Sequence, residues 1–241
     1  MSVTLAQGFV ASGLHAGIKT GERRDMSLLA TEDGRPVPTA AVFTQNKFRS
    51  PPVEASLERL NVSGGYASGV IVNSGNANAG TGTKGRADAE AMCAAAAGTV
   101  GCDPRDMLVC STGLIGFRLP MRKILTAIPR LGETLNRDGH RDAAKGILTT
   151  DTRPKEARVV RDEYAIGGMA KGCGMLAPNM ATMLAFLTTD AALTPEELKP
   201  ILFRAADATF NALITDGGTS TNHTVMLFAS GRQGRPADLA R

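Results

Sequence analysis

Four polar turns follow apolar stretches of this 241-residue chain and hold most of its chemically useful side chains. They are residues 73–82, 111–116, 149–152 and 215–224. Strand-end loops are where α/β proteins place their active sites, and glycines there let backbone N–H groups approach a ligand. The turns are rich in hydroxyls and amides but offer few acids and no Cys–His arrangement. A Ser-His-Asp triad is poorly supported, and we expect His15, His140 and His223 to be surface or turn residues.

A hydroxyl can act as a nucleophile without histidine when a threonine uses its own free α-amine as the base. An internal threonine lacks that amine, so the chain must first be cut immediately before it. The stretch KGCGMLAPNMATMLAFLTTD suits a cut between Ala181 and Thr182, because a loop rich in glycine and proline meets an apolar run there. Attack of the Thr182 hydroxyl on the preceding carbonyl gives an ester, and hydrolysis frees the amine. Taken alone, the pattern favours a strand that simply begins at a threonine, and Lys171 fits a solvated turn.

The elements that must position these turns alternate irregularly, which favours an α/β or α+β fold with layered sheets. Strands are expected within residues 8–19, 26–32, 39–48, 69–72, 106–116, 158–174, 182–189 and 225–229, and near Leu213. Helices are expected within residues 53–60, 85–98, 120–131, 140–148 and 194–210. The last of these helices begins with a capping box, a threonine followed three residues later by a glutamate.

Composition narrows the class of protein. Hydrophobic residues at 43% and charged residues at 21% indicate a globular chain. The net charge of +4 comes from scattered lysines and arginines, so no nucleic-acid surface is predicted. No apolar run approaches the ~20 residues that a membrane span needs, so no span is predicted either. The four cysteines show no metal-ligand spacing and are expected to be reduced small hydrophobes, and we expect a cytoplasmic protein without a signal peptide.

The stretch around Thr182 closely resembles the autocleavage segment of the glutamate N-acetyltransferase / ornithine acetyltransferase family of arginine biosynthesis. Members of that family cut themselves before a threonine in an Ala-Thr-Met-Leu context. Five further blocks resemble the family in the same order, namely VIVNSGNANAGTG, CSTGLIGFRLPM, ILTTDTRPK, GGMAKGCGM and FNALITDGGTSTN. Because the blocks span most of the chain, the resemblance is specific. It implies an N-terminal-nucleophile-like acetyltransferase fold.

The resemblance implies two pieces. Residues 1–181 would form an α-chain region that ends at Ala181, and residues 182–241 would form the first part of a β-chain. Thr182 would be its first residue, the nucleophile and a substrate contact.

The resemblance also implies roles for residues outside the cut. Thr112 and Gly113 match the oxyanion-hole pair, and a hydroxyl with a backbone N–H suits the charge of a tetrahedral intermediate. Lys171 matches a substrate-binding lysine, and a cation suits the α-carboxylate of an amino acid. Thr152 matches a substrate-binding threonine, with Thr150 as a close alternative.

The implied reaction is a ping-pong acetyl transfer from N-acetylornithine to glutamate through an acetyl-Thr182 ester. No metal or prosthetic group is expected, and acetyl-CoA is a further acetyl donor in some members. The α and β pieces are expected to stay together as a hetero-oligomer.

Several positions depart from the family pattern. Gly218 and His223 stand where acidic residues are usual, and Gly80 stands where a cysteine is common. The family continues beyond this length, so the resemblance predicts a chain truncated at the C-terminus that lacks a substrate-binding glutamate. Two other readings stay open: a self-processing amidohydrolase or aminopeptidase that uses water as acceptor, and an inactive truncated paralogue.

Overall fold

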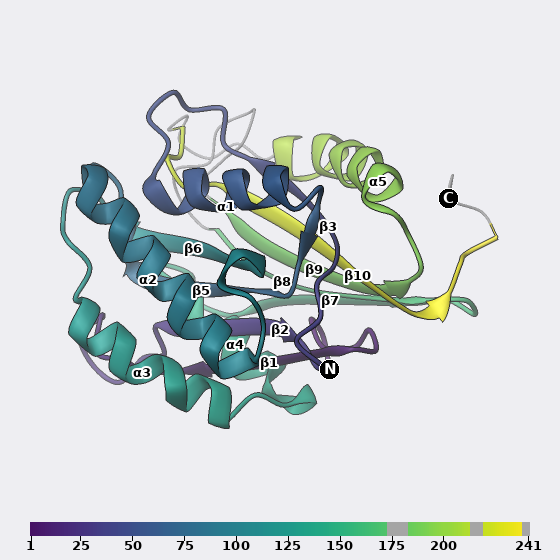
Figure 1. Ribbon diagram of the computed structural model, residues 1–241, viewed down its shortest axis with the longest axis horizontal. Helices are drawn as coiled ribbons and strands as arrows, with labels where there is room; N and C mark the ends of the chain where they lie inside the picture. Colours follow the sequence, from purple (N-terminus) through teal and green to yellow (C-terminus); the bar gives the residue numbers. More distant parts are fainter. Residues whose placement is uncertain (173–182, 213–218, 238–241) are drawn as a thin grey trace.

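The computed structural model of the protein describes residues 1–172, 183–212 and 219–237 (Figure 1). Within these residues, two β-sheets are stacked face to face, and helices cover the outer face of each sheet. This layering confirms the predicted α/β fold, because each apolar sheet face is buried against another layer. None of the described helices is both long and apolar enough to cross a membrane.

The first sheet has four strands in the order β1-β2-β5-β6. Their bounds are Phe9–Leu14 for β1, Met26–Thr31 for β2, Gly69–Asn76 for β5 and Met107–Leu114 for β6. β5 and β6 run parallel, with Ser74 opposite Thr112 and Gly75 opposite Gly113. Because parallel strands end at the same edge of a sheet, two of the predicted polar turns lie next to each other.

The second sheet has six strands in the order β4-β3-β10-β9-β8-β7. Their bounds are Tyr66–Ala67 for β4, Val37–Phe43 for β3, Thr224–Gly234 for β10, Leu184–Ala191 for β9, Ala165–Lys171 for β8 and Lys155–Val160 for β7. β9 pairs in parallel with β10 and antiparallel with β8, which places Leu184 opposite both Thr224 and Lys171. The end of β8 and the starts of β9 and β10 therefore meet at one edge.

Three apolar layers hold the sheets and helices together. Phe9, Phe186 and Phe228 are among the buried side chains between the two sheets. The helices α2 (Gly82–Val100) and α3 (Met121–Glu133) pack on the outer face of the four-stranded sheet. The helix α5 (Pro195–Ala208) packs on the outer face of the six-stranded sheet, on the opposite side of the molecule (Figure 1).

Two helices lie at the sides of the stack. α1 (Pro51–Val62) packs against β6 and α2, and α4 (His140–Gly146) packs against β1 and β2. Short 3-10 turns precede β6 (η1, Pro104–Asp106), precede α4 (η2, Arg137–Gly139) and follow α5 (η3, Phe210–Ala212). α4 leads into residues 147–154, which connect it to β7 and carry the predicted substrate-binding threonines.

The predicted helices and strands within the described residues agree with the structure in type. Residues 73–76, expected in a polar turn, instead extend β5 by pairing with β6, and the two-residue strand β4 was not predicted. The capping box is present at α5, where the Thr194 hydroxyl accepts from the Glu197 N–H and the Glu197 carboxylate accepts from the Thr194 N–H. The strand expected at residues 182–189 is β9 and is described from Leu184. The strand expected near Leu213 lies outside the described residues, as does the predicted boundary between residues 181 and 182.

Candidate functional site

The last residues of β6, called here the Thr112–Gly113 turn, leave room only for glycine at position 113. Gly113 has a φ of +136°, a conformation that L side chains rarely adopt. A Cβ at this position would lie 2.2 Å from the carbonyl carbon of Gly75 and 2.4 Å from the Asn76 nitrogen. The ends of β5 and β6 are therefore in direct backbone contact. Thr112, the other predicted oxyanion-hole residue, is 3% exposed.

Asparagine side chains stabilise this turn where the strands separate. The Ser111 hydroxyl donates to Asn73 Oδ1 at 2.6 Å, and Asn73 Nδ2 donates to the Asn76 carbonyl at 2.8 Å. Asn76 Nδ2 donates in turn to the carbonyls of Phe117 and Arg118 at 3.2 and 3.1 Å. These amides satisfy backbone groups that no longer pair within the sheet. The NSGNAN block thus fixes the position of the Thr112–Gly113 turn.

Lys171 crosses from the second sheet to this turn. It is the last residue of β8, it is 3% exposed, and its Nζ donates to Thr112 Oγ1 at 3.1 Å. The structure therefore brings together two residues that the sequence assigned to one site from separate blocks. A buried ammonium beside a glycine turn is suited to bind an anionic substrate group.

Asp151 joins the site from the segment after α4. Its Oδ1 accepts from the Gly172 N–H at 2.9 Å, and the carboxylate forms an ion pair with Lys155. Burial acts to raise the pKa of Asp151, but the hydrogen bonds from Lys155 and Gly172 and the charge of Lys171 outweigh it, so the pKa lies below its ordinary value. Its Oδ2 is buried and has no hydrogen-bond partner among the described residues.

The predicted threonines of the same segment are placed differently. Lys171 and Thr112 are buried, whereas Thr152 and its alternative Thr150 are both exposed. Their role in substrate binding stays a prediction. Sequence reasoning missed Asp151, although the signal was available as the one acid in the block between them.

Lys19 fastens this segment to the N-terminal region. Its ammonium donates to the Leu148 carbonyl at 2.6 Å and to the Arg24 carbonyl at 2.8 Å. Its side chain also packs against Gly75, where a Cβ would lie 2.9 Å from Lys19 Cγ. Burial, with repulsion from Arg23 and Lys171, lowers the pKa of Lys19 to about 8, although Asp25 and Asp151 oppose this shift. Nothing in the sequence pattern singled out Lys19.

The lowered pKa of Lys19 predicts a rise in stability at alkaline pH. Between pH 8 and about 10.5 the unfolded chain holds a proton that the folded chain has released, so the free energy of unfolding increases with pH. We expect a gain of about 1 kcal/mol, since the ammonium is only half-buried and solvent screens its interactions. Urea unfolding at pH 7.5 and 10 should show this difference when the wild type is compared with Lys19→Met. Equal pH slopes in the two proteins would contradict the prediction.

Met183, the residue just before β9, forms hydrogen bonds with two consecutive residues at the start of β10, His223 and Thr224. The Met183 N–H donates to His223 Nδ1 at 3.2 Å, and the Thr224 N–H donates to the Met183 carbonyl at 3.1 Å. Ala181 and Thr182, the predicted cleavage site and nucleophile, lie outside the described residues. The structure thus fixes the residue that directly follows them in the chain.

His223 corrects an expectation from the sequence. We expected a surface or turn residue, whereas His223 is fully buried at the edge where β9 and β10 begin. Its polar sequence neighbours gave the wrong impression because Asn222 and Thr224 are buried as well, with their polar atoms hydrogen-bonded inside the protein.

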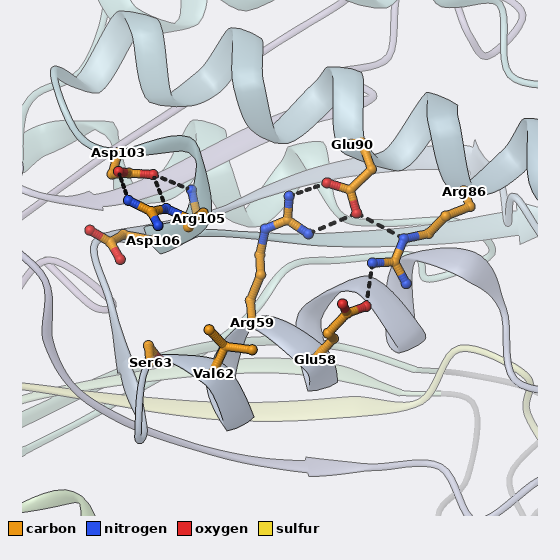
Figure 2. Close-up of a pocket in the computed structure, with 9 residues that line it drawn as sticks. All are labelled: Glu58, Arg59, Val62, Ser63, Arg86, Glu90, Asp103, Arg105 and Asp106. Atoms are coloured by element: carbon orange, nitrogen blue, oxygen red, sulfur yellow. Dashed lines mark hydrogen bonds and ion pairs between the residues drawn. The ribbon is translucent and has the colours of Figure 1, made fainter.

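A charged cavity of about 480 Å³ lies elsewhere, between α1, α2 and η1 (Figure 2). Its charges pair with one another: Arg59 binds both carboxylate oxygens of Glu90, while Arg86 binds Glu90 and Glu58. The hydrogen bond from Arg59 is the main cause that lowers the pKa of Glu90. The cavity lies at the start of β6, whereas Thr112 lies about 16 Å further along the strand. We interpret the network as a structural link between α1 and α2.

The cysteines of the described residues are unsuited to nucleophilic chemistry. Cys93 and Cys110 pack in the apolar layers, as the sequence predicts, and burial raises the pKa of each thiol to about 12. Both are therefore protonated at neutral pH, and a thiol is a poor nucleophile compared with a thiolate. Cys102 is free and partly buried, and Cys173 lies outside the described residues.

Two stacked sheets between helices, with a site at the sheet edge, define an N-terminal-nucleophile-like fold. The L-aminopeptidase D-Ala-esterase/amidase of Ochrobactrum anthropi, described as a variant of the Ntn hydrolase fold, superposes with a TM-score of 0.56. The match covers 99% of this chain and 76% of that chain at 14% identity, so the likeness concerns the fold alone.

The family follows from closer relatives. The ArgJ family model matches residues 10–241, and this chain belongs to the ArgJ family. The arginine biosynthesis bifunctional protein ArgJ of Thermobifida fusca is 48% identical over 240 residues, which cover 100% of this chain and 62% of that protein. The chain thus spans less than two thirds of this relative's length.

A solved structure of the same family agrees with this assignment. The ornithine acetyltransferase of Mycobacterium tuberculosis in complex with ornithine has a TM-score of 0.69 at 38% identity, covering 73% of this chain and 94% of that chain. The resemblance to the glutamate N-acetyltransferase / ornithine acetyltransferase family is thereby confirmed.

Proposed function

We propose that this chain carries the acyl-transfer site of an acetyltransferase that moves an acetyl group from N-acetylornithine to glutamate. The observation that supports this most directly is the contact between Lys171 Nζ and Thr112 Oγ1. It places a buried cation, which suits an amino-acid carboxylate, beside a turn whose hydroxyl and backbone N–H suit a developing oxyanion. Met183 is one residue after the proposed nucleophile. It lies at the edge of the second sheet where β8 ends at Lys171 and where β9 and β10 begin.

The proposed reaction begins with self-cleavage. The Thr182 hydroxyl attacks the carbonyl of Ala181, the resulting ester is hydrolysed, and Thr182 gains a free α-amine. That amine then accepts the hydroxyl proton as Oγ attacks the acetyl carbonyl of N-acetylornithine. The amide C–N bond breaks, and ornithine leaves with a proton on its amine. Glutamate's amine attacks the acetyl-Thr182 ester, which releases N-acetylglutamate and restores the hydroxyl.

The two pieces produced by this cut would stay associated. β9 and β10 belong to residues 182–241, whereas β8 and β3 belong to residues 1–181. Because β8 pairs with β9 and β3 pairs with β10, backbone hydrogen bonds join the pieces along both sides. A hetero-oligomer of α and β pieces is therefore part of the proposal. The proposal also includes a reaction that needs no metal or prosthetic group, acetyl-CoA as a further acetyl donor, and a cytoplasmic location.

Self-cleavage gives the first test of the proposal. We expect intact-mass analysis of the purified chain to show two pieces that divide between Ala181 and Thr182. The Thr182→Ala variant should remain in one piece and should form no acetyl-enzyme when given N-acetylornithine, because it lacks the attacking hydroxyl. Cleavage of that variant at the same bond would overturn the self-attack mechanism.

The fate of the acetyl group separates the proposal from hydrolysis. The cleaved protein is incubated with N-acetylornithine labelled in the acetyl group, with and without glutamate. Labelled N-acetylglutamate supports transfer, whereas free labelled acetate at the same rate in both samples would identify an amidohydrolase. A wild-type chain that stays uncut would argue for an inactive paralogue.

A further inference from the structure

Asn222 and His223 are consecutive buried residues that contact different parts of the candidate site. Asn222 Nδ2 donates to the Ser111 carbonyl at 2.9 Å and to the Ala77 carbonyl at 2.7 Å. His223 Nδ1 accepts from the Met183 N–H at 3.2 Å. Asn222 is 6% exposed and His223 is fully buried. One dipeptide thus links the ends of β5 and β6 to the start of β9.

These contacts lie next to the two proposed reacting groups in the chain. Ser111 directly precedes Thr112, the proposed oxyanion donor, and Met183 directly follows Thr182, the proposed nucleophile. The first of these residues belongs to the four-stranded sheet, and the second leads into the six-stranded sheet. A shift of one sheet relative to the other would therefore change the distance between hydroxyl nucleophile and oxyanion donors. Acyl transfer is sensitive to such shifts, since misplacement by about 1 Å can lower the rate by about 100-fold.

We propose that Asn222 and His223 act as positioning residues that set the spacing between the Thr112–Gly113 turn and the start of β9. This inference rests on the proposed function, because it assigns the dipeptide a role in the geometry of that same site. Asn222 holds the turn through its amide N–H groups, and His223 holds the start of β9 through a ring nitrogen. Neither side chain is proposed to touch the substrate.

The hydrogen bond at His223 defines which replacements preserve the link. Nδ1 can accept the Met183 N–H only when that nitrogen carries no proton, so the neutral ring has its hydrogen on Nε2. The side-chain oxygen of asparagine or aspartate can also accept at this distance from the backbone. Leucine has a similar volume but no acceptor, which leaves the buried Met183 N–H without this partner. An aspartate here would match the acidic residue that is usual in the family pattern.

Self-cleavage rates of a small set of variants test the proposal. We expect His223→Asn and His223→Asp to cleave within about threefold of the wild type, and His223→Leu to cleave at least about 30-fold more slowly. Asn222→Leu should slow cleavage to a similar degree, because it removes both donors to the β5 and β6 ends. Thr188→Val is the matched control, since it removes a buried hydrogen bond from β9 to the Val3 carbonyl, at 2.7 Å and away from the site. It should lower the thermal midpoint but leave the cleavage rate within about threefold.

The outcomes distinguish positioning from general stability. Rates that fall in proportion to the thermal midpoint in all variants, Thr188→Val included, would overturn the proposal, as would His223→Leu cleaving at the wild-type rate. A wild type that cleaves but transfers no acetyl group would refute the proposed function and leave the positioning role standing.

The imidazole itself provides a readout that does not depend on activity. Long-range ¹H–¹⁵N spectra of the Thr182→Ala chain should show His223 with an unprotonated Nδ1 and a protonated Nε2. The chain has three histidines, so the signal is assigned by its loss in His223→Asn. A protonated Nδ1 would overturn the contact with Met183, whether or not the wild type cleaves.

Discussion

Replacing Gly113 with alanine is expected to lower the rate of acetyl transfer by on the order of 100-fold, the loss seen when one oxyanion-hole donor is displaced. The added Cβ would lie 2.2 Å from the Gly75 carbonyl carbon, and φ at this position is +136°. Neither backbone can yield cheaply, because β5 and β6 are paired up to this point. The turn must therefore rotate, and the N–H of residue 113 moves with it. Steady-state kinetics of Gly113→Ala measures the effect.

Gly116→Ala is the matched control for this prediction. Gly116 has a φ of +88°, but a Cβ there meets no atom within 4 Å. The substitution should cost about 1 kcal/mol of stability through the left-handed backbone and leave the transfer rate within about threefold. Equal rate losses in the two variants would contradict the prediction. They would show that the left-handed backbone alone, and not the close approach of Gly75 to Gly113, causes the loss of rate.

Lys171→Met is expected to weaken ornithine binding by on the order of 100-fold, equivalent to about 3 kcal/mol. Methionine keeps most of the length of the side chain but removes the buried ammonium that donates to Thr112 Oγ1. An amino-acid carboxylate would then enter a site that has lost the proposed cationic partner. Isothermal titration calorimetry with ornithine measures this effect without requiring catalytic turnover.

Lys155→Met separates this effect from a general loss of positive charge. Lys155 forms an ion pair with Asp151, but the Lys155 side chain is 48% exposed, so the pair contributes little in water. We expect ornithine binding to change by less than about threefold. If both variants bound ornithine as tightly as the wild type, Lys171 would have no role in holding the carboxylate.

The local pattern of the sequence was sufficient for all helices and most strands of the described residues. Apolar runs predicted the strands, and the threonine and glutamate at the start of α5 form the capping box that their spacing indicated. These features depend on residues close together in the chain, which is why the sequence alone reveals them. Roles for the Thr112–Gly113 turn and Lys171 came from the family resemblance of the short blocks that hold them, and those roles stay predictions.

The stacking of the two sheets determined which distant residues contact each other at the candidate site. Lys171 and Thr112 are 59 positions apart, and their contact exists because the end of β8 faces the end of β6. His223 is buried because β9 and β10 begin side by side, which no pattern around NHT indicates. Asp151 and Lys19 join the site through backbone groups of distant segments, and the sequence does not show which backbone groups a side chain will meet. The sequence by itself supplied residue types that suit acyl transfer, whereas the tertiary structure determined which of the described residues lie together at one buried edge.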